Sequence, residues 1–144
     1  NGDTFGRRMF RPLLHGFLDT VREGHPETPI VMVSPIFSPI AETVPGPTSI
    51  DPTMPVTVFR TTGKPEDVAL GKLHLREMRQ IIASVVADRQ ALGDANLHYV
   101  DGLDLYGQTD WPVLPMADLL HPDPPAQRLM GERFAPILAQ ALGS

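Results

Sequence analysis

Proline restricts the fold of this chain more than any other residue. The sequence holds 16 prolines among 144 residues, roughly twice the usual share of about 5%. They cluster in two segments, with seven between residues 35 and 65 and six between residues 112 and 136. Because proline fixes φ and lacks an amide donor, neither a long helix nor a central strand can run through such a segment. The proline pattern therefore predicts ordered elements separated by two stiff surface segments.

Composition and charge narrow the class of protein. Apolar residues make up 42% of the chain, enough for a core, and we expect residues 1–144 to form a single domain. The net charge of −5 and the pI near 5.4 argue against nucleic acid as the main partner. No apolar stretch approaches the roughly 20 residues of a membrane span. The chain has no cysteine, which excludes disulfides, thiolate-bound zinc and thiol catalysis. The absence of cysteine does not decide whether the protein is cytoplasmic or secreted.

Hydrophobic periodicity predicts five elements in the order helix, strand, helix, strand, helix. Pro12 lies inside the first helical pattern and is expected to kink it or mark its true start, and Gly93 is expected to cap the second helix. The first strand is a continuous apolar run, typical of a strand buried on both faces of a parallel sheet. This alternation predicts an α/β fold. The expected ranges are 3–23, 29–35, 69–92 (with 65 as an alternative start), 97–101 and 125–142.

The predicted sheet is too small for its helices. Two parallel strands cannot bury three amphipathic helices, so we expect pairing with a missing N-terminal segment or with another chain. The sequence begins at Asn1 without a methionine, which agrees with residues upstream. Residues 36–67 form an insertion far longer than most connections, and we interpret it as a lid, a substrate wall or an interface. Residues 56–60 alternate in polarity and are expected to form a short strand or hairpin arm.

The residues that point to chemistry are Asp118-Leu119-Leu120-His121-Pro122, directly before the last predicted helix. An aspartate three residues ahead of a histidine can hold the imidazole in one tautomer and stabilise its protonated form, as in a Ser-His-Asp triad. Sites in open α/β sheets gather at the carboxyl ends of strands, where this loop is expected to lie. Two other interpretations stay open: a helix-entry turn with Asp118 as a local cap, and a zinc or manganese site built from Asp118, His121 and Asp123.

The turn and the segment after it resemble the C-terminal block of the SGNH (GDSL-type) esterases and lipases. In that family an Asp-x-x-His-Pro turn carries the catalytic Asp and His, and the next helix often has a glycine at the position of Gly131. The segments Val33-Ser34-Pro35 and His98–Asp101 also look like family strands. The resemblance implies a three-layer α/β/α, flavodoxin-like fold and hydrolysis of a small ester or acyl substrate. It implies His121 and Asp118 as catalytic residues, and neither a metal nor an organic cofactor.

The resemblance further implies that this chain is the C-terminal part of such a domain. The family's Gly-Asp-Ser block, which holds the nucleophile, is not in the sequence, so the serine is expected upstream. The family's Gly-x-Asn segment would end at or just before Asn1, which makes Asn1 a candidate oxyanion donor. The candidate substrate-lining residues are Ser34, Ile36, Phe37 and Trp111.

Each of these residues also has a structural interpretation. Ser34 is also interpreted as a strand-end residue that hydrogen-bonds the turn, and Trp111 as a side chain that pins its loop to the core. Two other functions stay open beside ester hydrolysis. One is an acyl- or acetyltransferase on the same fold, and the other is an interaction module without enzymatic activity.

Overall fold

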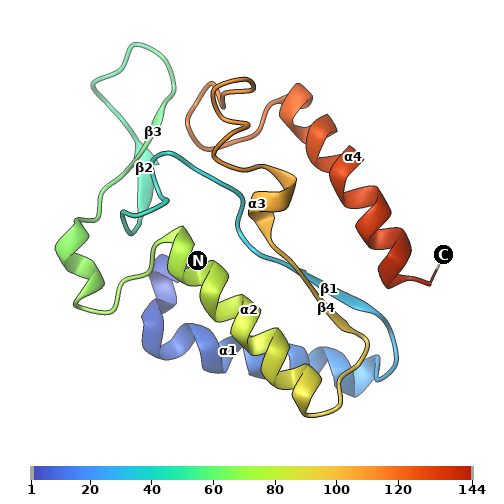
Figure 1. Ribbon diagram of the computed structural model, residues 1–144. Coiled ribbons are helices and arrows are strands. Elements are labelled where there is room, and N and C mark those ends of the chain that lie inside the picture. Colours follow the sequence, from blue (N-terminus) through green and yellow to red (C-terminus); the bar gives the residue numbers. More distant parts are fainter. Residues whose placement is uncertain (1, 144) are drawn as a thin grey trace.

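The computed structural model describes residues 2–143, and for residues 2–5 only the backbone. It contains two parallel strands, a separate hairpin and helices on either side of the strands (Figure 1). None of the helices in the described range has the length and hydropathy needed to span a membrane. The elements are α1 (Gly2–Gly24), β1 (Ile30–Val33), β2 (Thr48–Ile50), β3 (Phe59–Thr61), the 3₁₀ helix η1 (Pro65–Val68), α2 (Leu75–Ala91), β4 (Leu97–Val100), α3 (Gly102–Leu105) and α4 (Pro124–Ala141).

The two predicted strands pair in parallel, so the α/β prediction is confirmed at that level. The register places Ile30 opposite Leu97 and Val33 opposite Val100. Helices α1 and α2 lie side by side below this sheet in Figure 1, and α4 lies on the other side. The core on the α1–α2 side is built from Leu18, Val85, Val86 and Leu97, all at most 1% exposed.

The first strand is less buried than its apolar run predicts. Residues 30–32 are half-buried, and Val33 is 41% exposed. Part of the apolar stripe of α1 is open too, since Leu13 is 40% and Phe17 is 58% exposed. The physical reason is that β4 is the only strand paired with β1 among residues 2–143, so one edge of β1 has no neighbour.

The helix ends differ from the sequence prediction at glycines. Helix α1 is broken at Gly6, which adopts φ 64°, whereas Pro12 lies inside the helix without ending it. Gly71, with φ 90°, separates η1 from α2, so α2 begins later than expected and His74 caps it by accepting a hydrogen bond from the Glu77 amide. The predicted cap at Gly93 is confirmed, because it follows α2 with φ 104°. A positive φ favours glycine, which has no Cβ.

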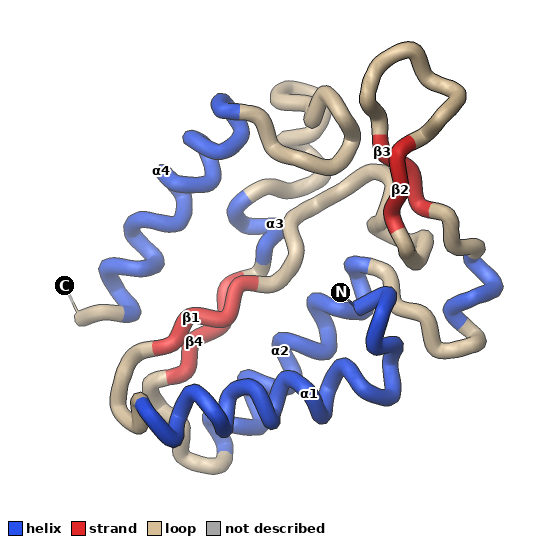
Figure 2. The backbone as a smooth tube through the Cα atoms, turned by 180° about the vertical axis from the view of Figure 1, so that it is seen from behind, coloured by secondary structure: helices blue, strands red, loops and turns tan. Residues whose placement is uncertain are grey.

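The 36–67 insertion folds back onto the rest of the chain. β2 and β3 pair antiparallel, and β3 overlaps the end of the predicted arm at residues 56–60 (Figure 2). The base of the insertion is held by Arg79, a buried residue of α2. Its guanidinium donates to the Pro35 carbonyl at 3.0 Å and pairs with Glu42. The base of the insertion is therefore attached to α2, whereas the loop between β2 and β3 projects from the body of the molecule (Figure 1).

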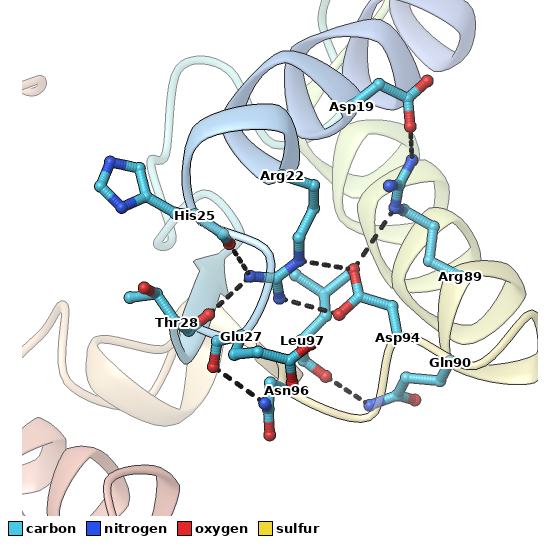
Figure 3. Close-up of polar contacts among 10 residues, drawn as sticks. All are labelled: Asp19, Arg22, His25, Glu27, Thr28, Arg89, Gln90, Asp94, Asn96 and Leu97. Carbon is cyan, nitrogen blue, oxygen red and sulfur yellow. Dashed lines mark hydrogen bonds and ion pairs between the residues drawn. The ribbon is translucent and has the colours of Figure 1, made fainter.

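The amino ends of the two strands are tied together by a charged network (Figure 3). Arg22 at the end of α1 makes a two-pronged contact with Asp94, with N–O distances of 3.0 and 2.8 Å. The same guanidinium donates to the carbonyls of His25 and Thr28. The Arg22 hydrogen bonds hold the pKa of Asp94 below its usual value. The network fixes the entry to β1 against the exit of α2, at the end of the sheet opposite the Asp118–His121 turn.

Candidate functional site

The Asp118–His121 turn is organised by a single carboxylate. Asp118 Oδ2 lies 2.7 Å from His121 Nδ1. Its other oxygen, Oδ1, accepts hydrogen bonds from the amides of Leu120 at 2.9 Å and His121 at 2.8 Å. This is the local turn that aspartate forms with amides two and three residues on. The three-residue spacing therefore brings the imidazole onto the carboxylate through hydrogen bonds within the turn itself.

The electrostatics of the turn keep Asp118 ionised. The hydrogen bond from the His121 amide is the largest cause that lowers the pKa of Asp118, followed by the imidazole and the Leu120 amide. Together they outweigh partial burial and bring the pKa to about 2. An ionised Asp118 favours the neutral imidazole tautomer with its proton on Nδ1, which leaves Nε2 as an acceptor. The His121 side chain is 65% exposed, and no group among residues 2–143 hydrogen-bonds to Nε2.

The turn rests on a buried anchor. Met116 is 1% exposed and belongs to an apolar cluster with Phe37, Tyr106 and Ala126. The Met116 carbonyl accepts from the Leu119 amide at 3.0 Å, which starts the turn. Leu119 has φ 67°, a left-handed conformation that is rare for a leucine, so the turn needs the packing beneath it.

The loop before the turn is tied to α4 by an ion pair that sequence reasoning missed. Arg133 contacts both carboxylate oxygens of Asp110, at 2.6 and 2.9 Å, and donates to the Leu105 carbonyl at 3.1 Å. The Gly107 amide also donates to Asp110, at 2.8 Å. The pKa of Asp110 is lowered, mainly by the hydrogen bond from Arg133. The sequence shows only that α4 carries an arginine next to the apolar Phe134. It does not identify the partner of that arginine, which lies 23 residues away.

The insertion reaches the turn through Phe59. The Phe59 ring meets the His121 imidazole edge to face, with ring centroids 5.3 Å apart and an angle of 80°. The Phe59 amide donates to the Asp118 carbonyl at 2.9 Å. Ser38, from the start of the insertion, donates to the Leu119 carbonyl at 3.4 Å. The segment considered as a lid or substrate wall therefore borders the Asp118–His121 turn, and the sequence alone did not pair Phe59 with His121.

Ser34 lies at the junction of the two strands. It is 3% exposed, and its hydroxyl accepts from the Gly102 amide and from the Tyr99 hydroxyl, both at 3.0 Å. It also donates to Asp101 at 3.4 Å. The hydroxyl therefore has three partners at the strand ends, and none of them is His121.

The other candidate lining residues come together below the turn. Ile36, Phe37 and Trp111 all belong to the cluster around Tyr106 and Met116. The rings of Phe37 and Trp111 are 6.4 Å apart between centroids. Phe37 is 7% exposed, so most of its surface contacts protein. Asn1, the candidate oxyanion donor, lies outside the described residues.

A metal site at the turn finds no support in the geometry. Among residues 2–143, no group of three or more His, Cys, Asp or Glu side chains is placed to hold a metal ion. Asp123, the third ligand in that interpretation, instead caps α4 by accepting a hydrogen bond from the Ala126 amide at 3.2 Å. Asp118 and His121 therefore form a pair without a third metal ligand among the described residues.

Comparison with known proteins identifies a structural relative. No family model matches the chain, and no curated protein is similar to it at a significant level. A solved structure, the salicylyl-acyltransferase SsfX3 from a tetracycline biosynthetic pathway, superimposes with a TM-score of 0.65 and 27% sequence identity over 93% of this chain. The match covers 32% of that protein, so the present chain spans about a third of its length. The α/β arrangement described above is thus shared with part of a larger acyltransferase.

Proposed function

We propose that this chain supplies the acid and base of a serine-type acyl-transfer site, as the C-terminal part of an SGNH-type, three-layer α/β/α domain. The observation that carries the proposal is the 2.7 Å contact between Asp118 and His121 Nδ1, with the other ring nitrogen exposed. The likeness to SsfX3, a salicylyl-acyltransferase, supports it. Because the chain spans about a third of the length of SsfX3, the activity, substrate and nucleophile are all part of the proposal, which places the nucleophile outside these 144 residues.

The proposed chemistry follows from the orientation of the imidazole. A serine outside this chain attacks the acyl carbonyl while His121 Nε2 takes its proton, and Asp118 stabilises the imidazolium. Nε2–H then protonates the leaving oxygen, which leaves an acyl-serine. In the second half, Nε2 takes a proton from the acceptor, the acceptor attacks the acyl carbon, and the serine departs with the proton. No step requires Asp118 to gain a proton, in agreement with its low pKa.

The acceptor separates two activities of this site. Water as acceptor gives an ester or acyl hydrolase, the activity implied by the family resemblance. An alcohol or another nucleophile gives an acyltransferase, and the likeness to SsfX3 favours this second candidate. Product analysis of the complete protein with an activated ester and a competing alcohol distinguishes them. If the ratio of ester formed with the alcohol to free acid exceeds the ratio of the alcohol and water concentrations, the result supports transfer. If free acid is the only product, the result supports hydrolysis.

The decisive test is His121→Ala in the complete protein. The proposal expects turnover of p-nitrophenyl acetate to fall by at least about a thousandfold. Far-UV circular dichroism should stay unchanged, because the imidazole is exposed. Asp118→Asn should lower kcat by a similar order, since it removes tautomer control. Unchanged turnover in His121→Ala would refute the role of His121 as the base. No fluorophosphonate labelling of any serine in the complete protein would leave the non-enzymatic interpretation as the better one.

Pairing of this chain with a further segment is part of the same proposal. One edge of β1 has no partner among residues 2–143, and Val33 and Phe17 are exposed nearby on β1 and α1. Strands that pair along this edge would bring further residues to the carboxyl end of the sheet. The nucleophile and the oxyanion donors would come from those strands.

A further inference from the structure

A cavity of about 230 Å³ lies between the 36–67 insertion and the start of α2, beside the Asp118–His121 turn. Its floor is apolar, with Leu73 completely buried and Met78 9% exposed. Leu120, the residue directly before His121, forms part of its wall. Pro35 also lines it and comes directly after Ser34 at the end of β1, so the cavity sits at the carboxyl end of the sheet.

We propose that this cavity binds the acyl group of the substrate, and that this group is an apolar chain or ring of up to about eight non-hydrogen atoms. The inference rests on the proposed function and adds its substrate class. It starts from the shared wall: Leu120 contributes to the cavity while its neighbour His121 carries the base, so an acyl group held there has its carbonyl carbon next to the acid–base turn.

The lining supports an apolar occupant. Leu73, Met78 and Leu120 are joined there by Ala41 and Val44 of the insertion, and two polar side chains at the wall, those of Ser38 and His74, have partners of their own. Ser38 donates to the Leu119 carbonyl, and His74 caps α2. A pocket with an apolar lining and few polar groups is the usual form of a small-molecule site. Free fatty acids and aromatic acids of matching length are therefore suitable probes.

The size of the cavity sets the upper limit on the acyl group. A volume of about 230 Å³, at roughly 30 Å³ for each water-sized group, accommodates seven or eight non-hydrogen atoms. With the carbonyl group left at the turn, the seven-carbon tail of an octanoyl group or the phenyl ring of a benzoyl group meets this limit, whereas the eleven-carbon tail of a dodecanoyl group exceeds it. Each methylene that moves from water into the cavity should raise the affinity about fourfold.

Other cavities do not carry such an inference. The one at the amino ends of the strands, about 300 Å³, is lined by Arg22, Arg89 and Asp94, whose charges already pair with one another (Figure 3). The one beside α2 and α3, about 390 Å³, includes the Arg79–Glu42 pair. Both lie away from the Asp118–His121 turn.

Binding is testable on this chain without any catalysis. Methyl-labelled protein is titrated with butyrate, octanoate and dodecanoate while the Leu73, Met78 and Leu120 methyl signals are followed by NMR. The expected result is that octanoate shifts these three signals and binds at least tenfold more tightly than butyrate, with no further gain for dodecanoate. Shifts confined to other methyl groups, or an affinity that keeps rising to dodecanoate, would overturn the inference.

Two variants change the cavity in opposite directions. Ala41→Leu fills it and should weaken octanoate binding at least tenfold. Ala69→Leu makes the same change at an exposed position before α2, outside the cavity, and serves as the matched control with unchanged binding. Leu120→Ala enlarges the cavity and should shift the preferred length from eight towards ten or twelve carbons. Equal octanoate affinity in folded Ala41→Leu and in the control would refute the assignment, as would an unchanged length preference in Leu120→Ala.

Kinetics of the complete protein test the acyl cavity and the proposed function separately. The ratio of kcat/KM for p-nitrophenyl octanoate to that for the acetate should fall at least tenfold in Ala41→Leu and stay constant in Ala69→Leu. If His121→Ala abolishes turnover while Ala41→Leu keeps the ratio, the acyl cavity is wrong and the proposed function stands. If octanoate binds at the cavity while His121→Ala keeps full turnover, the cavity stands and the proposed function is wrong.

Discussion

Replacing Asp118 by asparagine tests the electrostatic account of the turn through stability alone. The asparagine side chain keeps an oxygen for the Leu120 and His121 amides but lacks the charge that holds the imidazole. The pKa of Asp118 is about 2 against an ordinary value of 3.8, a difference of just under two pKa units. At about 1.4 kcal/mol per unit this gives an upper limit of about 2.5 kcal/mol. The side chain is 26% exposed, so we expect a loss of only about 1–2 kcal/mol at pH 7 after solvent screening.

The pH dependence fixes the sign of the effect. Because the folded-state pKa lies below the unfolded-state value, the unfolded chain binds the proton more readily as pH falls. The stabilisation by Asp118 is therefore complete above about pH 5 and is lost as pH falls through 2, with about half remaining near pH 3. Urea unfolding of the wild type and Asp118→Asn, followed by circular dichroism at pH 7 and pH 3, measures both values.

The matched control is Asp104→Asn, which removes an exposed carboxylate in α3 that accepts no side-chain hydrogen bond among residues 2–143. It should change the free energy of unfolding by less than about 0.5 kcal/mol at both pH values. The reasoning is refuted if Asp118→Asn costs no more than this control at pH 7. It is equally refuted if the cost of Asp118→Asn is the same at pH 3 as at pH 7.

Three further substitutions probe the supports of the site. Met116→Ala should cost about 2–5 kcal/mol in urea unfolding, because Met116 is 1% exposed, whereas Val113→Ala at a 75% exposed position should cost under about 0.5 kcal/mol. Asp94→Asn should cost about 2–3 kcal/mol at neutral pH by leaving Arg22 without its counter-ion, and less at pH 3 because the pKa of Asp94 is lowered. Phe59→Ala should lower kcat of the complete protein about tenfold with KM within about twofold, and Phe59→Tyr should restore it. A change in KM alone would show that Phe59 contacts substrate and does not position His121.

The sequence predicted what depends on nearby residues. The parallel pairing of the two strands follows from their apolar runs and the helix between them, and Gly93 ends α2 because the next turn needs a positive φ. The contact between Asp118 and His121 is local in the same sense, since one Asp-centred turn brings the two side chains together.

The contacts that the sequence did not predict join distant segments. Arg133 and Asp110 belong to different elements, and nothing in either neighbourhood identifies the other as its partner. Phe59 lies in a proline-rich insertion whose path depends on the Arg79 anchor, so its contact with His121 could not be derived from periodicity. Burial of β1 was overestimated for a related reason: an apolar run reports the burial that a strand needs, whereas actual burial depends on which strands lie beside it.

The geometry also separates the parts of the site that this chain forms from those that the proposed function places outside it. Asp118 orients His121 through contacts within four residues, and the turn rests on Met116, which lies in the same loop. Under the proposed function, the acid and base are therefore set before the nucleophile arrives, and binding of a further segment need not rearrange them. The proposal then requires that segment to bring its serine to an exposed nitrogen beside Phe59. Since Phe59 and Leu120 border the turn from the insertion and from the cavity, the direction of approach left to the nucleophile is the exposed side of the imidazole.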